Sequence, residues 1–107
     1  MFPKEQRLRK SQDIILTLRT GTRRNAPVVA CSFLRRPGTV TRTAVIVGTK
    51  VSKLAVTRNL YKRRTRSILE QLLLPNGDLV VQLRPGSQNL SFQQLEVQVR
   101  QCLRNLN

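Results

Sequence analysis

The sequence predicts a small α+β domain in which helices pack on one sheet, in the order α-β-β-α-β-α. The chain has 107 residues, a length that suits one domain. Stretches with hydrophobic residues at helical spacing alternate with short runs rich in valine. Pro-Gly and Pro-Asn-Gly segments separate these stretches, and no repeat or linker interrupts them. We therefore expect a single domain over residues 1–107, with 1–6 as a mobile end.

The first expected helix is "KSQDIILTLRTG", residues 10–21. Ser11 can cap its N-terminus, Asp13 suits the positive end of the helix dipole, and Gly21 ends it. The hydrophobic residues that share one face of this helix are Ile14, Ile15 and Leu18.

Two strands are expected next, at 28–34 and 43–49, on either side of a Pro37-Gly38 turn. Both are rich in valine and other residues that favour strands. A β-hairpin is the simplest connection between them.

A longer helix is expected over 52–74, where "PNGD" ends it. Arg58, Lys62 and Arg66 recur every four residues, so they line one outer face, with Arg63 beside them. The residues that can form the inner stripe are Tyr61, Thr65, Ile68, Leu69 and Leu72.

A third strand is expected at 78–84 and a last helix at 91–105. Ser91 and Gln94 have the spacing of a capping box at the start of this helix. The residues at helical spacing that predict its buried stripe are Leu95, Val99, Cys102 and Leu106.

The charge of the chain points to an anionic partner. Lys and Arg number 20 against 5 Asp and Glu, and the net charge is +15. No acid lies between Ile14 and Leu69, although most of the basic residues do. Such a surface repels itself unless an anion neutralises it. Nucleic acid is the first candidate and an anionic membrane the second.

The residues offer little for catalysis. The chain has no His, which excludes a Ser-His or Cys-His nucleophile, and it has no phosphate-binding glycine loop. Two-metal nuclease chemistry wants clustered carboxylates. The acids are scattered instead, at Glu5, Asp13, Glu70, Asp78 and Glu96. We therefore expect a binding protein with no catalytic residue and no metal ligand of its own.

The two cysteines, Cys31 and Cys102, stand in apolar surroundings and are expected to be small buried hydrophobic residues. No Cys/His pattern indicates zinc. No long apolar run indicates a signal peptide or a membrane span, so we expect a cytoplasmic protein.

A basic helix face can follow phosphates, but it does not separate DNA from RNA. Aromatic residues that could stack on bases are few, with one Tyr and three Phe. Phe33 stands in an expected strand, where it could lie on an exposed sheet face. Phe92 and Tyr61 are expected in the core, and Phe2 in the mobile end.

Four segments appear in an order that is similar to a known family: "KEQRLRKSQD" (4–13), "AVTRNLYKRRTR" (55–66), "DLVVQLRPG" (78–86) and "LSFQQLEVQVRQCL" (90–103). Together they resemble the protein subunit of bacterial ribonuclease P, over nearly the whole chain. The most specific part is Arg58-Asn59, followed by Lys62-Arg63 and Arg66. The "RLRKSxD" opening supports it independently.

The resemblance implies a fold of the ribosomal protein S5 domain 2-like kind, with a left-handed β-α-β crossover where connection rules favour a right-handed one. It also implies a partner role in an endoribonuclease. A catalytic RNA carries the active site and, with Mg²⁺ bound mainly by the RNA partner and the substrate, removes the 5′ leader of precursor tRNA. The protein alone is expected to be inactive. The implied partners are the catalytic RNA and precursor tRNA, without membrane or DNA.

The same resemblance assigns residues. RNA binding falls on Arg58, Asn59, Lys62, Arg63, Arg66, Lys50, Lys53, Arg7, Arg9 and Lys10. A cleft for the single-stranded leader falls on Ile14, Leu18, Ser32 and Phe33.

Three departures from the family pattern bear on these sites. Leu60 stands where the motif usually has a second Arg, Ile14 and Leu18 stand where aromatic residues are common, and Ser32 stands where an aromatic residue or His is frequent. Both readings of Ile14 and Leu18 remain open, as cleft residues or as core.

A second reading is a basic structural RNA-binding protein, such as a ribosomal protein. Composition and charge fit it equally well, and the RNA that co-purifies from cells would separate the two. A third reading, a DNA-coating protein, lacks any helix-turn-helix or minor-groove arm. Comparing binding to structured RNA and to duplex DNA at equal salt would test it.

Overall fold

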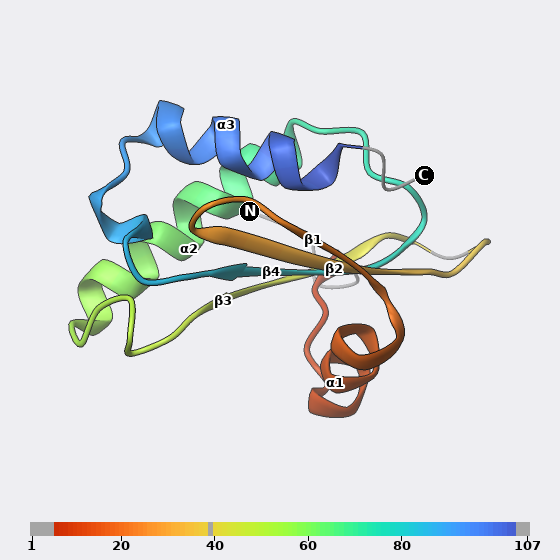
Figure 1. The fold of residues 1–107 in the computed structure, drawn as a ribbon. Helices are drawn as coiled ribbons and strands as arrows, with labels where there is room; N and C mark the ends of the chain where they lie inside the picture. The colour runs from red at the N-terminus through yellow and green to blue at the C-terminus, as the bar shows by residue number, and fades with distance from the viewer. Residues whose placement is uncertain (1–5, 39, 105–107) are drawn as a thin grey trace.

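The computed structural model describes residues 6–38 and 40–104, and it confirms the α+β class and the expected order of elements. Helices α2 and α3 lie together on one face of the sheet, and α1 lies on the other (Figure 1). Each expected strand is present within a residue or two of its predicted bounds. The elements are α1 (Ser11–Thr20), β1 (Thr22–Asn25), β2 (Val29–Arg35), β3 (Arg42–Val47), α2 (Ala55–Glu70), β4 (Gly77–Leu83), the 3₁₀-helix η2 (Ser87–Asn89) and α3 (Phe92–Leu103).

The sheet has the strand order β1-β2-β4-β3. Strand β2 is antiparallel to β1 and to β4, whereas β3 is parallel to β4. The expected hairpin between β2 and β3 is therefore wrong, because β4 lies between them. Nearly every residue of β2 and β4 is buried, while buried and half-exposed residues alternate along β3. Strands that are covered on both faces belong in the middle of a sheet.

The parallel pairing of β3 with β4 through α2 makes a β-α-β crossover, as the resemblance implied. The left hand of this crossover stays a prediction.

Strand β1 was not expected from the sequence. Its four residues, "TRRN", are all exposed and carry no hydrophobic alternation, so the pattern gives no strand signal. It pairs with β2 through a tight connection in which the Ala26 N–H donates to the Val29 carbonyl at 2.7 Å. The true hairpin of the fold is thus β1–β2. Basic side chains on such an outer strand oppose pairing with a second sheet.

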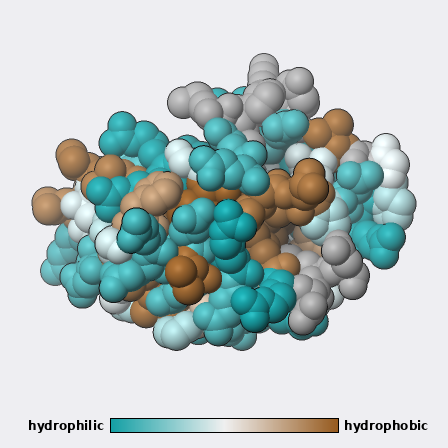
Figure 2. All heavy atoms as spheres, turned by 90° about the horizontal axis from the view of Figure 1, so that it is seen from above, coloured by the Kyte–Doolittle hydropathy of each residue, from teal (hydrophilic) through white to brown (hydrophobic). Residues whose placement is uncertain are grey.

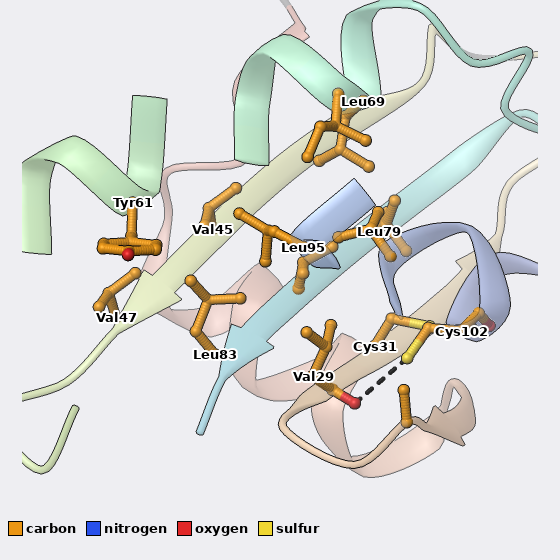
Figure 3. Close-up of a cluster of buried hydrophobic side chains, with 14 of the residues drawn as sticks. Val29, Cys31, Val45, Val47, Tyr61, Leu69, Leu79, Leu83, Leu95 and Cys102 are labelled. Carbon is orange, nitrogen blue, oxygen red and sulfur yellow. Dashed lines mark hydrogen bonds between the residues drawn. The ribbon is translucent and has the colours of Figure 1, made fainter. Parts of the chain in front are cut away.

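The hydrophobic core lies between the sheet and the helices α2 and α3 (Figure 3). The inner stripes are confirmed, with Tyr61, Thr65, Ile68 and Leu69 buried on α2 and Leu95, Val99 and Cys102 buried on α3. Leu72 is half-buried beyond the end of α2, and Leu106 lies outside the described residues, as does the mobile end predicted at 1–6 apart from Gln6.

Two expectations about the core need separate comment. Both cysteines are buried, as predicted: the Cys31 thiol donates to the Cys102 carbonyl and the Cys102 thiol to the Val29 carbonyl. A hydrogen bond with Cys102 and burial raise the pKa of Cys31 well above its ordinary value, so this thiol stays neutral. The prediction that Phe92 is a core residue is wrong. It stands at the first residue of α3, before the buried stripe begins, and is 41% exposed.

The predicted start of α3 is confirmed, whereas the predicted cap of α1 and the predicted bounds of α2 are wrong. The capping box of α3 is confirmed, with the Ser91 hydroxyl accepting from the Gln94 N–H and the Gln94 side chain accepting from the Ser91 N–H. Ser11 is not the cap of α1: Lys10 takes that position, and no described side chain caps it. The helix α2 is shorter at both ends than the expected 52–74, because a turn precedes it and its last turn tightens after Glu70.

Gly21 ends α1 as predicted and brings the helix close to β2. A side-chain carbon at this position would lie 2.6 Å from the Thr17 carbonyl oxygen and 2.7 Å from the Phe33 carbonyl oxygen. Only a residue without Cβ permits this approach. The C-terminal end of α1 is thereby held against the sheet.

Candidate nucleic-acid interface

The basic residues of α2 other than Arg64 occupy one flank and the exposed side of the helix. Arg58, Lys62 and Arg66 are half-exposed and share the flank beside the buried stripe described above, while Arg63 and Asn59 are exposed. Seen from the side of α2 and α3, the surface is mainly hydrophilic, with hydrophobic patches near its middle and at its left edge (Figure 2). The basic residues of this face thus reach the solvent to differing degrees.

Arg58 also shapes the loop that precedes α2. Its Nη1 donates to the carbonyl oxygens of Ser52 and Lys53, both at 3.0 Å. These bonds hold the loop against the first turn of the helix, and Lys50 and Lys53 in that loop are exposed. The structure thus brings both loop lysines to the N-terminal end of the basic face. Sequence spacing could not show this second role of Arg58.

Arg64 is directed differently from the other basic residues of α2. Its guanidinium lies 5.2 Å from the centre of the Tyr61 ring, within the range of a cation–π contact. The Tyr61 hydroxyl in turn donates to the Gln88 carbonyl at 2.7 Å. Arg64 therefore packs toward the segment around η2, away from the outer face.

The N-terminal basic residues lie at the outer edge of β3. Arg7 forms an isolated parallel bridge with Thr43, and the Leu8 N–H donates to the Thr43 carbonyl at 2.8 Å. Leu8 is buried, while Arg9 and Lys10 are exposed. Because α2 also packs on β3, the two basic groups flank the same edge strand. The structure therefore places the Arg9–Lys10 pair and the basic helix on neighbouring parts of the molecule.

The predicted leader-cleft residues divide between the two faces of the sheet. Side chains alternate along β2, so Ser32 faces α1 and Phe33 faces the core. The prediction that Phe33 lies on an exposed face is wrong, since it is 4% exposed. Ser32 is buried beneath α1, and its hydroxyl has no hydrogen-bond partner among the described residues. Ile14 and Leu18 are half-buried and lie outside the core cluster.

A half-exposed strip of the sheet lies beside α1. The helix packs chiefly on β2 and β4. On β3 the residues of the same face are half-exposed, among them Ala44 and Ile46, and Gln82 of β4 pairs with Ile46. Sequence reasoning missed these three residues. The alternation of β3 carried the signal, but their place on the face of the sheet that α1 covers depends on β3 lying beside β4.

A cluster of ion pairs joins this face to α1. Asp78, which is 2% exposed, accepts from Arg42 Nε at 2.9 Å, Arg42 Nη2 at 2.8 Å and Arg36 Nη1 at 3.1 Å. Arg42 Nη1 also lies 3.4 Å from the Asp13 carboxylate on α1. The Asp78 carboxylate is the main cause that raises the pKa of Arg42. Arg42 therefore engages two carboxylates, Asp78 of β4 and Asp13 of α1.

Across 6–38 and 40–104, no three His, Cys, Asp or Glu side chains come together as metal ligands would. Among the helices of the same ranges, none has the length and apolar character needed to cross a membrane.

Comparison with known proteins identifies similar chains. The family model for ribonuclease P matches residues 2–107. A ribonuclease P protein component from Pseudanabaena sp. is 36% identical over 99 residues, covering 89% of this chain and 85% of the relative. One from Cyanothece sp. is 33% identical and covers 96% of this chain and 93% of the relative.

Solved structures share the fold. The RNase P protein of Staphylococcus aureus superposes with a TM-score of 0.85 at 19% identity, covering 94% of each chain. The RNase P protein of Thermotoga maritima gives a TM-score of 0.83 at 23% identity and covers 94% of this chain and 97% of its own. The layered arrangement of Figure 1 is thus the fold of these proteins.

Proposed function

This chain belongs to the ribonuclease P protein family, and from this premise we propose that it serves as the protein subunit of a bacterial ribonuclease P. In this role it binds a catalytic RNA and the 5′ leader of precursor tRNA, and it assists the Mg²⁺-dependent removal of that leader in the cytoplasm. The observation that carries the proposal is the outward basic face of α2 in a chain of this family.

The two faces of the sheet suggest a division of work. On one side, α2 and the loop with Lys50 and Lys53 offer positive charge spaced along a rigid helix, which suits the phosphates of a folded RNA. On the other side, α1 with Ile14 and Leu18 covers β2 and β4, and the same face of β3 is half-exposed, a surface suited to an extended single strand. The catalytic RNA is assigned to the first surface and the leader to the second.

The chemistry of cleavage is assigned to the RNA partner. The chain has no His, and its carboxylates Asp13 and Asp78 are engaged by Arg42. Mg²⁺ is proposed to be held mainly by phosphates of the RNA partner and the substrate, where hard oxygen ligands are plentiful. The protein contributes positive charge, which offsets repulsion between the two RNAs.

Reconstitution tests this proposal. Nuclease-treated protein alone is expected to leave precursor tRNA uncut at any Mg²⁺ concentration. Added to a bacterial ribonuclease P RNA, it is expected to lower the Mg²⁺ concentration needed for leader removal, because protein cations replace part of the ion atmosphere. Cleavage by the RNA-free protein would contradict the proposal. Co-purification with whole ribosomal particles, instead of one large structured RNA, would favour the ribosomal-protein alternative.

A double substitution tests the leader surface. Changing Ile14 and Leu18 together to Phe is expected to tighten binding of a precursor with a leader, since each stacked base contributes roughly 1–3 kcal/mol. Affinity for mature tRNA, which has no leader, should hardly change. Both affinities can be measured on the reconstituted holoenzyme. If the double variant unfolds instead, the two residues belong to the core and this assignment fails.

A further inference from the structure

The use of acids in this chain is selective. Only 5 acidic residues stand against 20 basic ones, yet Asp78 is buried in the sheet and Asp13 stands in the first turn of α1. The same side chain, Arg42, contacts both carboxylates. In a protein that must attract an anion, acids at these places oppose binding by charge alone. The arrangement of these two acids therefore indicates a role other than attracting an anion.

The geometry of Arg42 joins three elements. From β3, its Nε and Nη2 hold Asp78 of β4 in a two-point contact at 2.9 and 2.8 Å. Its remaining terminal nitrogen, Nη1, reaches Asp13 of α1 at 3.4 Å. A guanidinium is planar and offers donors in a fixed fork, so fixing it on Asp78 also fixes the direction of Nη1. A lysine ammonium could not serve both carboxylates in this way.

The Arg42–Asp13 contact falls between two other attachments of α1. Before the helix, the Leu8 N–H is bonded to the Thr43 carbonyl on β3. After the helix, Gly21 allows the close approach to β2. The contact with Asp13 ties the first helical turn to β3, and Ile14 is the next residue. Ala44 and Ile46, which are half-exposed, lie farther along the same face of β3 as Arg42.

We propose that Arg42 is a positioning residue for the leader: anchored on Asp78, it holds Asp13 and with it the first turn of α1 at a fixed place beside β3. This inference rests on the proposed function and adds to it. The contact sets the distance between Ile14 and the half-exposed strip. It thereby sets the space that is available to a single strand. It does not involve the basic face of α2.

The negative charge of Asp13 and its role in positioning α1 predict opposite results when Asp13 is changed to Asn. The substitution removes one negative charge, so charge alone predicts tighter binding of every RNA. If the first turn of α1 is no longer held in place, binding is expected to weaken, but only for substrates that have a leader. Glu96→Gln is the matched control, because Glu96 pairs with Arg100 on α3, exposed and far along the chain from α1, and its change removes the same charge.

The experiment uses the reconstituted holoenzyme with precursor tRNA and with mature tRNA. For Asp13→Asn, the ratio of the two affinities is expected to fall about threefold, the scale of a half-exposed ion pair. Glu96→Gln should leave the ratio as in the wild type. The salt dependence of binding to the catalytic RNA should not change for either variant. Thermal unfolding checks that both variants fold.

A second variant tests the contact between Arg42 and Asp13 from the side of Arg42. Arg42→Lys keeps the charge but loses the fork, and it is expected to lower the same ratio. The double variant with Asp13→Asn should lower the affinity ratio little further, because each single change already removes the contact between residues 42 and 13. An unchanged or raised ratio for Asp13→Asn, or equal weakening for both substrates, overturns the inference. If the wild-type holoenzyme shows no preference for the leader, the proposed function itself fails.

Discussion

Changing Asp78 to Asn is expected to lower the free energy of unfolding by about 2–4 kcal/mol. Asp78 is 2% exposed and accepts three hydrogen bonds from Arg36 and Arg42. An amide keeps the shape but removes the buried negative charge that the guanidinium groups of Arg36 and Arg42 contact. The arginine side chains are 43% and 27% exposed, so water moderates the loss. Thermal or urea unfolding followed by circular dichroism measures it, with about 4–8 °C expected per kcal/mol.

Asp13→Asn provides the control for this prediction. It removes the same charge and also a contact with Arg42, but the Asp13 side chain is 27% exposed and its distance is 3.4 Å. A loss of about 0–1 kcal/mol is expected there. Equal losses for the two variants would show that burial of Asp78 does not determine the effect. A loss limited to Asp78→Asn would identify this carboxylate as a structural centre of the sheet.

Changing Lys62 or Arg66 to Ala is expected to weaken binding to the catalytic RNA and to lower the salt slope by about one unit for each lost phosphate contact. Changing Asn59 to Ala should weaken specific binding with little change in slope, since its amide is uncharged. Arg64→Ala should matter least, because Arg64 lies over the Tyr61 ring. Affinity across a salt series, with folding checked by circular dichroism, distinguishes these cases.

Arg58 is expected to differ from its neighbours on the helix. Its loss removes a basic contact and also the two bonds to the Ser52 and Lys53 carbonyls, so the loop with Lys50 loses its support. Arg58→Ala should therefore cost more affinity than Lys62→Ala. If Arg58, Lys62, Arg63, Arg64 and Arg66 all lose affinity equally on change to Ala, the stretch acts as diffuse charge and the assignment of an outer face fails.

The parts of the fold that depend on local pattern could be predicted from the sequence. The stripe from Tyr61 to Leu69 and the capping box at Ser91 follow from spacing within one helix, and the structure confirms both. The shared flank of Arg58, Lys62 and Arg66 on α2 follows from the same period. Such features need no knowledge of which strands are neighbours.

The parts that depend on distant pairing could not be predicted. A turn signal at Pro37-Gly38 suggested a hairpin, but the strand order places β4 between β2 and β3. Phe33 was expected on an exposed face but is buried. The face that a strand residue occupies is known only once the neighbours of the strand are known. Likewise, Arg42 meets acids that lie 29 and 36 residues away in the chain, a distance at which spacing carries no information.

The central place of β4 has a consequence for biosynthesis. On the ribosome, β2 can pair with β1 at once, but neither β2 nor β3 can pair with β4 until Gly77–Leu83 has been made. Until then α2, with its concentrated positive charge, has only one edge strand beneath it. Closure of such long-range pairings is slow compared with helix formation. The nascent chain therefore passes through a stage in which the basic helix α2 has been made but the central strand β4 has not, and the sheet is completed late in synthesis.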